Sequence, residues 1–309
     1  MNPPRWKHLF GPVNSRRYGR SLGINLFPAK VCTENCIYCE CGTTTELTTE
    51  RREYVPTAEV CRELELFLAT APALNYITFA GAGEPLLHSG FGEIVHFLKK
   101  HFPAYRVCLL TNGTLLTDRA VWPEVARVDL VVPSLDAVTQ EVFEQINRPA
   151  AGTSASAIID ALREFSQQFE GEIQLEVLLL PGVNDDNAEV QRIADACRTI
   201  RHTLVQVHTL DRPGTCHELQ PLRPERMAEL ARFFDTATMP TRSYAASAVE
   251  SIDQDELRHR VIALVTLRPS TEEDMVSAIG AERGSLREVL QTLVESGVLQ
   301  RDGEFYRGA

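Results

Sequence analysis

Short apolar runs alternate with amphipathic stretches over most of this chain, from Leu22 to about Phe234. The runs have the length of strands, and in the stretches between them apolar residues recur every three or four positions, as on one face of a helix. This alternation indicates repeated β/α units around a parallel sheet. Six units fit an open, incomplete (β/α)6 barrel of the TIM type better than a closed eight-fold one. The expected strands are Ser21–Leu26, Asn75–Ala80, Arg106–Thr111, Val128–Pro133, Ile173–Leu180 and Leu204–Leu210, and the expected helices are Thr57–Ala69, Phe91–His101, Ser154–Phe169, Asn187–Ile200 and Pro224–Phe234.

The last part of the chain has a different pattern. Three helical periods, over residues 256–267, 271–279 and 284–296, are followed by two short strand patterns on either side of Asp302-Gly303. An Asp-Gly pair between strands favours a tight hairpin, and three helices with a hairpin describe a winged helix. We therefore expect a partial barrel over residues 1–240, a linker over 241–254 and a winged-helix domain over 255–309.

Composition indicates in which compartment of the cell the protein is expected. No stretch approaches the roughly 18 to 20 consecutive apolar residues that a membrane span needs, and the N-terminus lacks the apolar core of a signal peptide. We expect a cytoplasmic protein with no membrane partner. The eight cysteines should then be reduced thiols rather than a disulfide framework.

Charge is unevenly distributed along the chain. The formal net charge of −11 argues against a protein that is coated by nucleic acid. However, six basic residues precede the first acidic one, Glu34, and such a block could contact phosphates or carboxylates near the following site. A solvated N-terminal surface is the alternative. The basic residues are Arg5, Lys7, Arg16, Arg17, Arg20 and Lys30.

Three cysteines form the most specific motif. Cys32, Cys36 and Cys39 have the spacing C-x3-C-x2-C and follow the first expected strand, so their loop opens at the end of the barrel where active sites lie. Soft thiolates select zinc or iron–sulfur clusters, and three ligands leave one metal position open for a substrate. Cys41 is a possible fourth thiol, which would favour a closed zinc site instead.

Glycine and polar residues follow the next three expected strands. The segment Gly81-Ala82-Gly83-Glu84-Pro85 ends the second strand, where glycine allows close backbone approach to a ligand and Glu84 offers an acceptor for an ammonium group. Asn112-Gly113 ends the third strand, and Ser134 and Asp136 follow the fourth. A tight turn is the alternative for the two glycine segments.

In this order, the motifs resemble those of the radical S-adenosylmethionine (SAM) superfamily, over roughly Phe10 to Gly214. The resemblance implies that the three cysteines hold a 4Fe–4S cluster whose open iron is chelated by SAM. It also implies that reductive cleavage of SAM gives a 5′-deoxyadenosyl radical, which abstracts hydrogen from a substrate. A reductant such as flavodoxin or ferredoxin would supply the electron. The SAM contacts implied are Tyr38, Gly81, Gly83, Glu84, Pro85, Asn112, Ser134 and Asp136, with Ser134 and Asp136 on the ribose.

A narrower resemblance points to a substrate. The segments Phe10–Arg17, Glu40–Gly42 and Thr209–Gly214 look like a bacterial and archaeal group of radical enzymes related to the tRNA wybutosine synthases. That relationship implies a tRNA base as substrate. The wybutosine reaction is thought to use a lysine Schiff base with pyruvate, and Lys30, beside the cysteine loop, is the candidate in this chain.

Four further residues are candidates for substrate chemistry. Asp185, Asp211 and Arg212 follow the fifth and sixth strands, and Cys216 could donate a hydrogen atom to a substrate radical. The Pro-Gly pairs beside them equally mark ordinary loops. Three functions are therefore compared: modification of an RNA base, modification of a peptide or protein docked by the winged helix, and DNA regulation by a metal-binding protein without catalysis.

Overall fold

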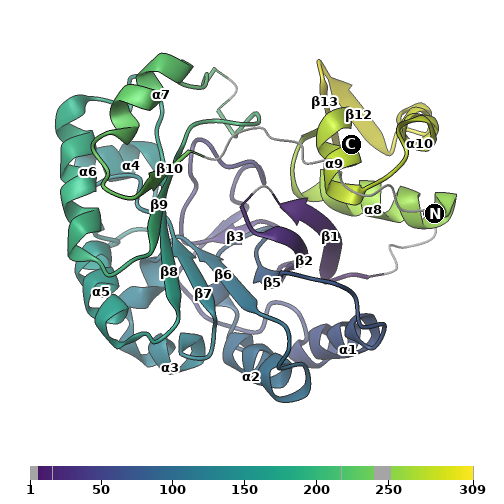
Figure 1. The fold of residues 1–309 in the computed structure, drawn as a ribbon, viewed down its shortest axis with the longest axis horizontal. Helices are drawn as coiled ribbons and strands as arrows, with labels where there is room; N and C mark the ends of the chain where they lie inside the picture. The colour runs from purple at the N-terminus through teal and green to yellow at the C-terminus, as the bar shows by residue number, and fades with distance from the viewer. Residues whose placement is uncertain (1–5, 16, 217, 240–251, 309) are drawn as a thin grey trace.

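An eight-stranded sheet forms the main body of the protein (Figure 1). The structure, a computed structural model, describes residues 6–15, 17–216, 218–239 and 252–308. The strand order is β1-β2-β5-β6-β7-β8-β9-β10, in which β1 is antiparallel to β2 and every later pair of neighbours is parallel. The strands are β1 (Leu9–Ser15), β2 (Gly19–Ile24), β5 (Tyr76–Phe79), β6 (Val107–Thr111), β7 (Leu130–Pro133), β8 (Glu172–Leu178), β9 (Leu204–His208) and β10 (Ala237–Thr238).

All six expected strands are confirmed, with ends that differ by a few residues. Four strands of the barrel part were not expected. β1 contains Gly11-Pro12 and has an irregular register between Phe10 and Val13, so it lacks a regular strand pattern; as an edge strand it tolerates proline. The others, β10 and the separate pair β3 (Val31–Cys32) and β4 (Glu46–Leu47), have two residues each.

Helices cover the outer side of the curved sheet (Figure 1). The five expected helices are confirmed, whereas α3 and α4 are too short to show a helical period in the sequence. Within the described ranges, every helix is too short or too polar to span a lipid bilayer. The helices are α1 (Thr57–Leu68), α2 (Phe91–His101), α3 (Trp122–Val125), α4 (Gln140–Ile146), α5 (Ala155–Gln168), α6 (Asn187–Thr199) and α7 (Pro224–Ala231).

The core fills both sides of the sheet. Strand residues that face the helices, such as Val131 and Leu175, are fully buried, which explains the continuous apolar runs of a covered parallel sheet. On the inner side, Tyr18 packs on Cys108 and Leu130 and fills the base of the barrel interior. The sheet ends at β1 and β10, so the barrel is open in the part of the chain that the structure describes.

The C-terminal unit has its own small core. Helices α8 (Gln254–Leu267), α9 (Glu272–Ile279) and α10 (Arg283–Glu295) pack together, and β11 (Ser270–Thr271) joins the hairpin of β12 (Leu299–Asp302) and β13 (Phe305–Gly308). The three helices and the Asp-Gly hairpin agree with the sequence expectation. Most of the expected linker, residues 241–251, lies outside the described residues, as do Arg5 and Arg16 of the basic block.

Arg212, in the loop after β9, joins the two units. Its side chain is only 5% exposed, and its Nη2 donates to Oδ1 of Asp274 in α9 at 2.9 Å. Its Nη1 lies 3.0 Å from Oδ2 of Asp211 and 3.3 Å from Oε1 of Glu40. Because Glu40 follows Cys39 directly, one buried cation connects the C-terminal unit to the cysteine loop.

Replacing Asp274 tests this connection. Asp274→Ala removes a partner of the buried guanidinium and also the capping box that Asp274 forms with Thr271 at the start of α9. We expect the free energy of unfolding to fall by about 1–3 kcal/mol, measured by urea denaturation. The control Glu288→Ala, at an exposed position of α10, should change it by less than about 0.5 kcal/mol. Equal losses in both variants would contradict the connection.

Candidate active site

The three cysteines of the C-x3-C-x2-C motif lie in one loop that starts at β3. Each is partly buried, and each sulfur has a polar neighbour. Asn112 Nδ2 lies 3.7 Å from the sulfur of Cys32, and Asn147 Nδ2 lies 3.6 Å from the sulfur of Cys36. The ammonium of Lys30 donates to the sulfur of Cys39 at 2.5 Å. The Cys36 thiol also donates to Oε2 of Glu34 at 3.2 Å. A donor therefore lies near each sulfur, and a carboxylate lies beside Cys36 as well.

The glycine segment after β5 clamps the start of this loop. Val31 donates to the carbonyl of Ala82 at 3.1 Å, and Glu84 donates to the carbonyl of Val31 at 3.1 Å. Gly83 has φ of 149°, and a Cβ there would lie 1.8 Å from the Val31 oxygen. Only glycine fits this contact, so the motif predicted to approach a ligand also positions the cysteine loop.

The loop after β9 holds the other end of the cysteine segment. Cys216 donates its N–H to the carbonyl of Ile37 at 3.0 Å, and the Thr215 hydroxyl donates to the carbonyl of Cys36 at 3.0 Å. A Cβ on Gly214 would lie within 2.7 Å of backbone atoms of Tyr38. Cys216 thus lies beside the cysteine loop, and its role as a hydrogen donor stays a prediction.

The cysteine thiols differ in their pKa values because their charged neighbours differ. The neighbouring Cys41 side chain and the Lys30 ammonium lower the pKa of the Cys39 thiol to about 5, whereas burial raises the pKa of Cys32 to about 12. Burial opposes the charge on Lys30, but the neighbouring cysteines, Cys39 first, outweigh it and raise the pKa of this lysine. Lys30 is therefore an ammonium here, which is not the nucleophilic form that a Schiff base requires.

This donor set fits an iron–sulfur cluster. Thiolate is the ligand that such clusters prefer, and the Lys30 ammonium beside Cys39 favours the thiolate form of that residue. Cys41 turns its thiol to the carbonyl of Gly81 at 3.3 Å. Among the described residues, no three His, Cys, Asp or Glu side chains are arranged to hold a single metal ion.

Glu84 is a buried carboxylate at the end of β5. It is 2% exposed and accepts hydrogen bonds from the Thr111 hydroxyl and the Asn112 N–H, both at 2.8 Å. Burial raises the pKa of Glu84 to about 7. Pro85 starts a short 3₁₀ turn, Pro85–Leu87, to which the Glu84 side chain serves as the N-cap.

A pocket lies next to the cysteine loop, at the carboxyl ends of β6 and β7. It has a polar rim and an apolar wall from α4 and α5. This combination suits a ligand with an apolar ring and several hydroxyls. The lining residues are Glu34, Asn112, Ser134, Leu135, Asp136, Ala137, Phe143, Asn147, Ala155 and Ile158.

Asp136 uses its carboxylate within the protein. Oδ1 accepts from the Leu178 N–H at 2.9 Å, and Oδ2 accepts from the Tyr38 hydroxyl at 2.5 Å and Asn147 Nδ2 at 3.2 Å. The predicted ribose contact of Asp136 stays a prediction. Asn147, which also lies near Cys36, was missed in the sequence because it follows a helix rather than a strand.

The charged residues predicted to meet substrate have protein partners. Asp185 accepts from the Gly182 N–H at 2.7 Å and so closes its own loop. Asp211 pairs with Arg212, whose guanidinium faces α9 and Glu40 as described above. Their role toward a substrate stays a prediction.

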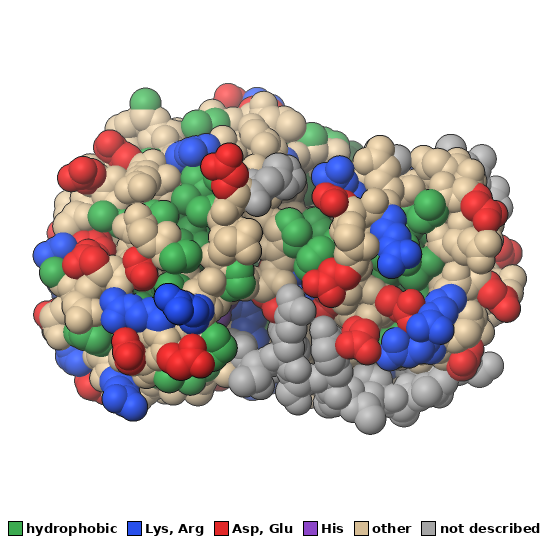
Figure 2. All heavy atoms as spheres, turned by 90° about the horizontal axis from the view of Figure 1, so that it is seen from above, with side chains coloured by type: hydrophobic (Ala, Val, Ile, Leu, Met, Phe, Trp, Pro, Cys, Tyr) green, Lys and Arg blue, Asp and Glu red, His purple; other side chains and the backbone are tan. Residues whose placement is uncertain are grey.

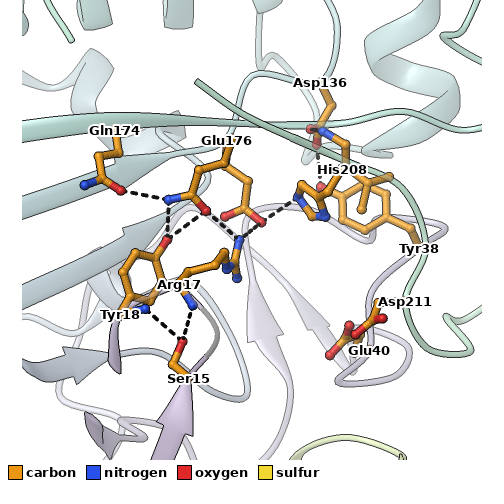
Figure 3. A network of polar contacts seen from close by, with 12 residues as sticks. Ser15, Arg17, Tyr18, Tyr38, Glu40, Asp136, Gln174, Glu176, His208 and Asp211 are labelled. Carbon is orange, nitrogen blue, oxygen red and sulfur yellow. Dashed lines mark hydrogen bonds and ion pairs between the residues drawn. The ribbon is translucent and has the colours of Figure 1, made fainter. Parts of the chain in front are cut away.

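A second polar network, missed in the sequence, lies inside the barrel (Figure 3). Arg17 Nη1 donates to Oε1 of Glu176 in β8 at 2.6 Å, and His208 Nε2 in β9 lies 2.8 Å from the same oxygen. The available signal was polar residues at alternate positions of two otherwise apolar strands, Gln174 with Glu176 and Gln206 with His208.

Comparison with known proteins agrees with this site. The family model described as "Radical SAM superfamily" matches residues 26–194, just over half of the chain and both the cysteine loop and the pocket. The chain belongs to the radical SAM superfamily. Members of this superfamily bind a 4Fe–4S cluster and SAM and need an external reductant, so both predicted cofactors are confirmed.

Several curated proteins are similar over most of this radical SAM chain. A UPF0026 protein of Helicobacter pylori is 33% identical over 277 residues, which cover 86% of each chain. The GTPase Obg of Brachyspira hyodysenteriae is 31% identical over 302 residues, 96% of this chain but 44% of that protein, so the chain spans less than half of that relative's length. The GTP 3′,8-cyclase of Chlorobaculum tepidum is 28% identical over 235 residues, 74% of this chain and 67% of that one.

Solved structures share the fold. A radical SAM methyltransferase from Sphaerobacter thermophilus has a TM-score of 0.54 at 19% identity, over 71% of this chain and 66% of that one. TYW1 with a lysine-pyruvate adduct bound has a TM-score of 0.52 at 15% identity, over 73% of this chain and 75% of that one. The parallel sheet is thus that of a radical SAM partial TIM barrel.

Proposed function

We propose that this chain is a radical SAM enzyme that abstracts hydrogen from an RNA base, with Cys32, Cys36 and Cys39 as the cluster ligands. The observation that carries the proposal is the cysteine loop held between the Gly83 segment and the loop after β9 at the carboxyl ends of parallel strands. When bound, the cluster and SAM supply a 5′-deoxyadenosyl radical. The protein's part is to hold three thiolates, leave a fourth position open and exclude water.

The surrounding residues would hold SAM. Glu84 accepts N–H groups of the methionine amino group, and the exposed backbone from Gly81 to Pro85 allows its close approach. The adenosine part would lie at the pocket beside Asn112, with the Ser134 hydroxyl and Asp136 near the ribose. Tyr38, in the cysteine loop, lines the adenine side, where its hydroxyl is held by Asp136.

The raised pKa of Glu84 predicts pH-dependent SAM binding. Below its pKa of about 7 the carboxyl group is protonated and loses the charge that attracts the amino group. If only the carboxylate binds, SAM affinity at one pH unit below that pKa is about tenfold lower than at high pH. Equilibrium dialysis across this range, with Glu84→Gln as the reference for titration of SAM itself, measures the difference. If the ratio of SAM affinities between the wild type and Glu84→Gln is the same at every pH, Glu84 does not bind the amino group of SAM.

Several facts support a nucleobase substrate. Relatives named GTP 3′,8-cyclase are 28–31% identical to this chain. Arg17 of the N-terminal basic block points into the barrel interior rather than to solvent alone (Figure 3). Lys30, an ammonium bound to Cys39, is retained as the candidate for a Schiff base only if cluster binding releases it.

Modification of a peptide or protein is the second candidate, and the C-terminal unit favours it. We infer that this unit, over residues 255–309, is a winged helix, because three helices and a three-stranded antiparallel sheet follow that order. Its helix α10 has Arg283 and Arg287 paired with Glu272, so it lacks the free basic face of a DNA reader. Protein docking therefore suits the unit better than regulation of DNA.

Formation of 5′-deoxyadenosine tests the proposed function. Anaerobic protein with a verified cluster, dithionite and SAM is assayed with bulk tRNA, without it, and with flavodoxin or ferredoxin as reductant. We expect 5′-deoxyadenosine to rise well above the uncoupled rate only when tRNA is present. Slow formation that is independent of tRNA would contradict the RNA substrate and favour peptides.

A further inference from the structure

We propose that Arg17, Glu176 and His208 form a recognition site inside the barrel that binds the hydrogen-bonding edge of a nucleobase. The inference deepens the proposed function and rests on it. Arg17 comes from the turn between β1 and β2, Glu176 from the inner face of β8, and His208 from the end of β9. Figure 3 shows Arg17 and His208 reaching Glu176, with His208 on the side of Tyr38.

The site lies between the base of the barrel and the cysteine loop. Below it, Tyr18 is 6% exposed and packs on Cys108 and Leu130, which closes the interior. Beside it, the backbone of Glu176 pairs with Ser134, a residue of the proposed SAM pocket. A molecule held on Glu176 would therefore lie next to the place where SAM is expected to be cleaved.

The three side chains can be reached from solvent. The exposed fractions are 27% for Arg17, 16% for Glu176 and 21% for His208, although all three lie within the sheet's inner side. Figure 2, a view from above, shows a hollow near the middle of the molecule with basic and histidine side chains in it. The contacting atom of His208, Nε2, is itself buried, so the exposed part of this side chain is the rest of its ring.

The network leaves hydrogen-bonding atoms unused. Arg17 and His208 both contact Oε1 of Glu176, and among the described residues no partner is found for Oε2 or for Nη2 and Nε of Arg17. Gln206 Nε2 donates to Gln174 and Tyr18, and its Oε1 accepts from Arg17 Nη1 at 3.3 Å. The Arg17 guanidinium and His208 outweigh the burial of Glu176 and hold its pKa well below its usual range. The site thus offers a charged acceptor, Glu176, beside a charged donor, Arg17.

The Glu176 carboxylate beside the Arg17 guanidinium favours a ligand with an uncharged edge. That edge should carry a hydrogen-bond donor next to an acceptor. A phosphate would meet the negative charge of Glu176, and an ammonium group would meet the positive charge of Arg17. A trans peptide group points its N–H and C=O in opposite directions and cannot offer both at once. Nucleobases carry N–H donors and carbonyl or ring-nitrogen acceptors side by side, in reach of a carboxylate and a guanidinium.

Binding of nucleoside monophosphates tests the site. GMP, AMP, UMP and CMP are titrated into the cluster-loaded protein by calorimetry, with ribose 5-phosphate as the base-free control. We expect at least one nucleotide to bind the wild type roughly tenfold or more tightly than ribose 5-phosphate. Glu176→Gln should remove this preference, and Glu172→Gln, on the same strand but paired with Arg106, should keep it.

Three results would overturn the inference: no nucleotide preferred over ribose 5-phosphate, an unchanged preference in Glu176→Gln, or equally tight binding of N-acetylglutamine amide. Should Glu176→Gln fail to fold, His208→Gln, whose ring contacts the same carboxylate, is expected to weaken the preference in the same direction. Formation of 5′-deoxyadenosine by the wild type is measured in parallel. Its absence would refute the proposed function, whereas its presence without nucleotide preference refutes this site alone.

Discussion

Replacing Cys32, Cys36 or Cys39 by alanine is expected to abolish the 4Fe–4S cluster and all cleavage of SAM. Each thiolate supplies one of three protein bonds to the cluster, so removing one leaves the cluster with two. Iron and sulfide content, together with visible absorbance after anaerobic reconstitution, measures the loss. Wild-type protein treated in parallel gives the iron content, sulfide content and absorbance of the complete cluster.

Two cysteine variants are the matched controls. Cys61→Ala, in α1 and away from the loop, and Cys41→Ala, whose thiol faces the Gly81 carbonyl, should both keep the cluster. If Cys41→Ala loses its bound metal as the three loop variants do, while Cys61→Ala keeps it, the closed four-thiol zinc site is favoured. A cluster that survives in all three loop variants would refute the ligand assignment.

Gly83→Ala is expected to displace the cysteine loop and destabilise the barrel. The new methyl group would lie 1.8 Å from the Val31 carbonyl, and both groups are fixed to backbone that cannot move independently. The positive φ adds strain for any residue with a Cβ. We expect a loss of about 2–4 kcal/mol in the free energy of unfolding, measured by urea denaturation, and less than half of the wild-type iron.

Gly42→Ala is the control that adds backbone strain without a steric clash. Gly42 also has a positive φ, of 85°, but a Cβ there has no atom within 4 Å. It should therefore lose only about 1–2 kcal/mol and keep its cluster. If the two variants behave alike, the contact between Gly83 and Val31 does not position the loop.

The parts of the site that the sequence predicts are those encoded within short segments. The spacing of Cys32, Cys36 and Cys39 is local, and the Gly83-Glu84 segment follows its strand directly. In a parallel sheet all strand ends meet at one edge, so polar residues after successive strands fall near one another whatever the helices between them do. That rule places Glu84, Asn112 and Ser134 around the loop without knowledge of the packing.

Contacts between distant segments could not be predicted in this way. Arg17 reaches Glu176 across 159 positions because the irregular hairpin of β1 folds its turn into the barrel. Arg212 was expected to face substrate from its place after the sixth strand, yet its guanidinium contacts Asp274 of the C-terminal unit. Both contacts depend on how two separately formed elements dock, which no local pattern encodes.

The most direct test of the central claim is the electron paramagnetic resonance spectrum of the reduced, reconstituted protein before and after SAM is added. Three cysteine ligands leave one iron open, so SAM should bind that iron and change the spectrum, and Glu84→Gln should weaken this response. A reduced 4Fe–4S signal that SAM leaves unchanged would show that no iron position is open and would contradict the account.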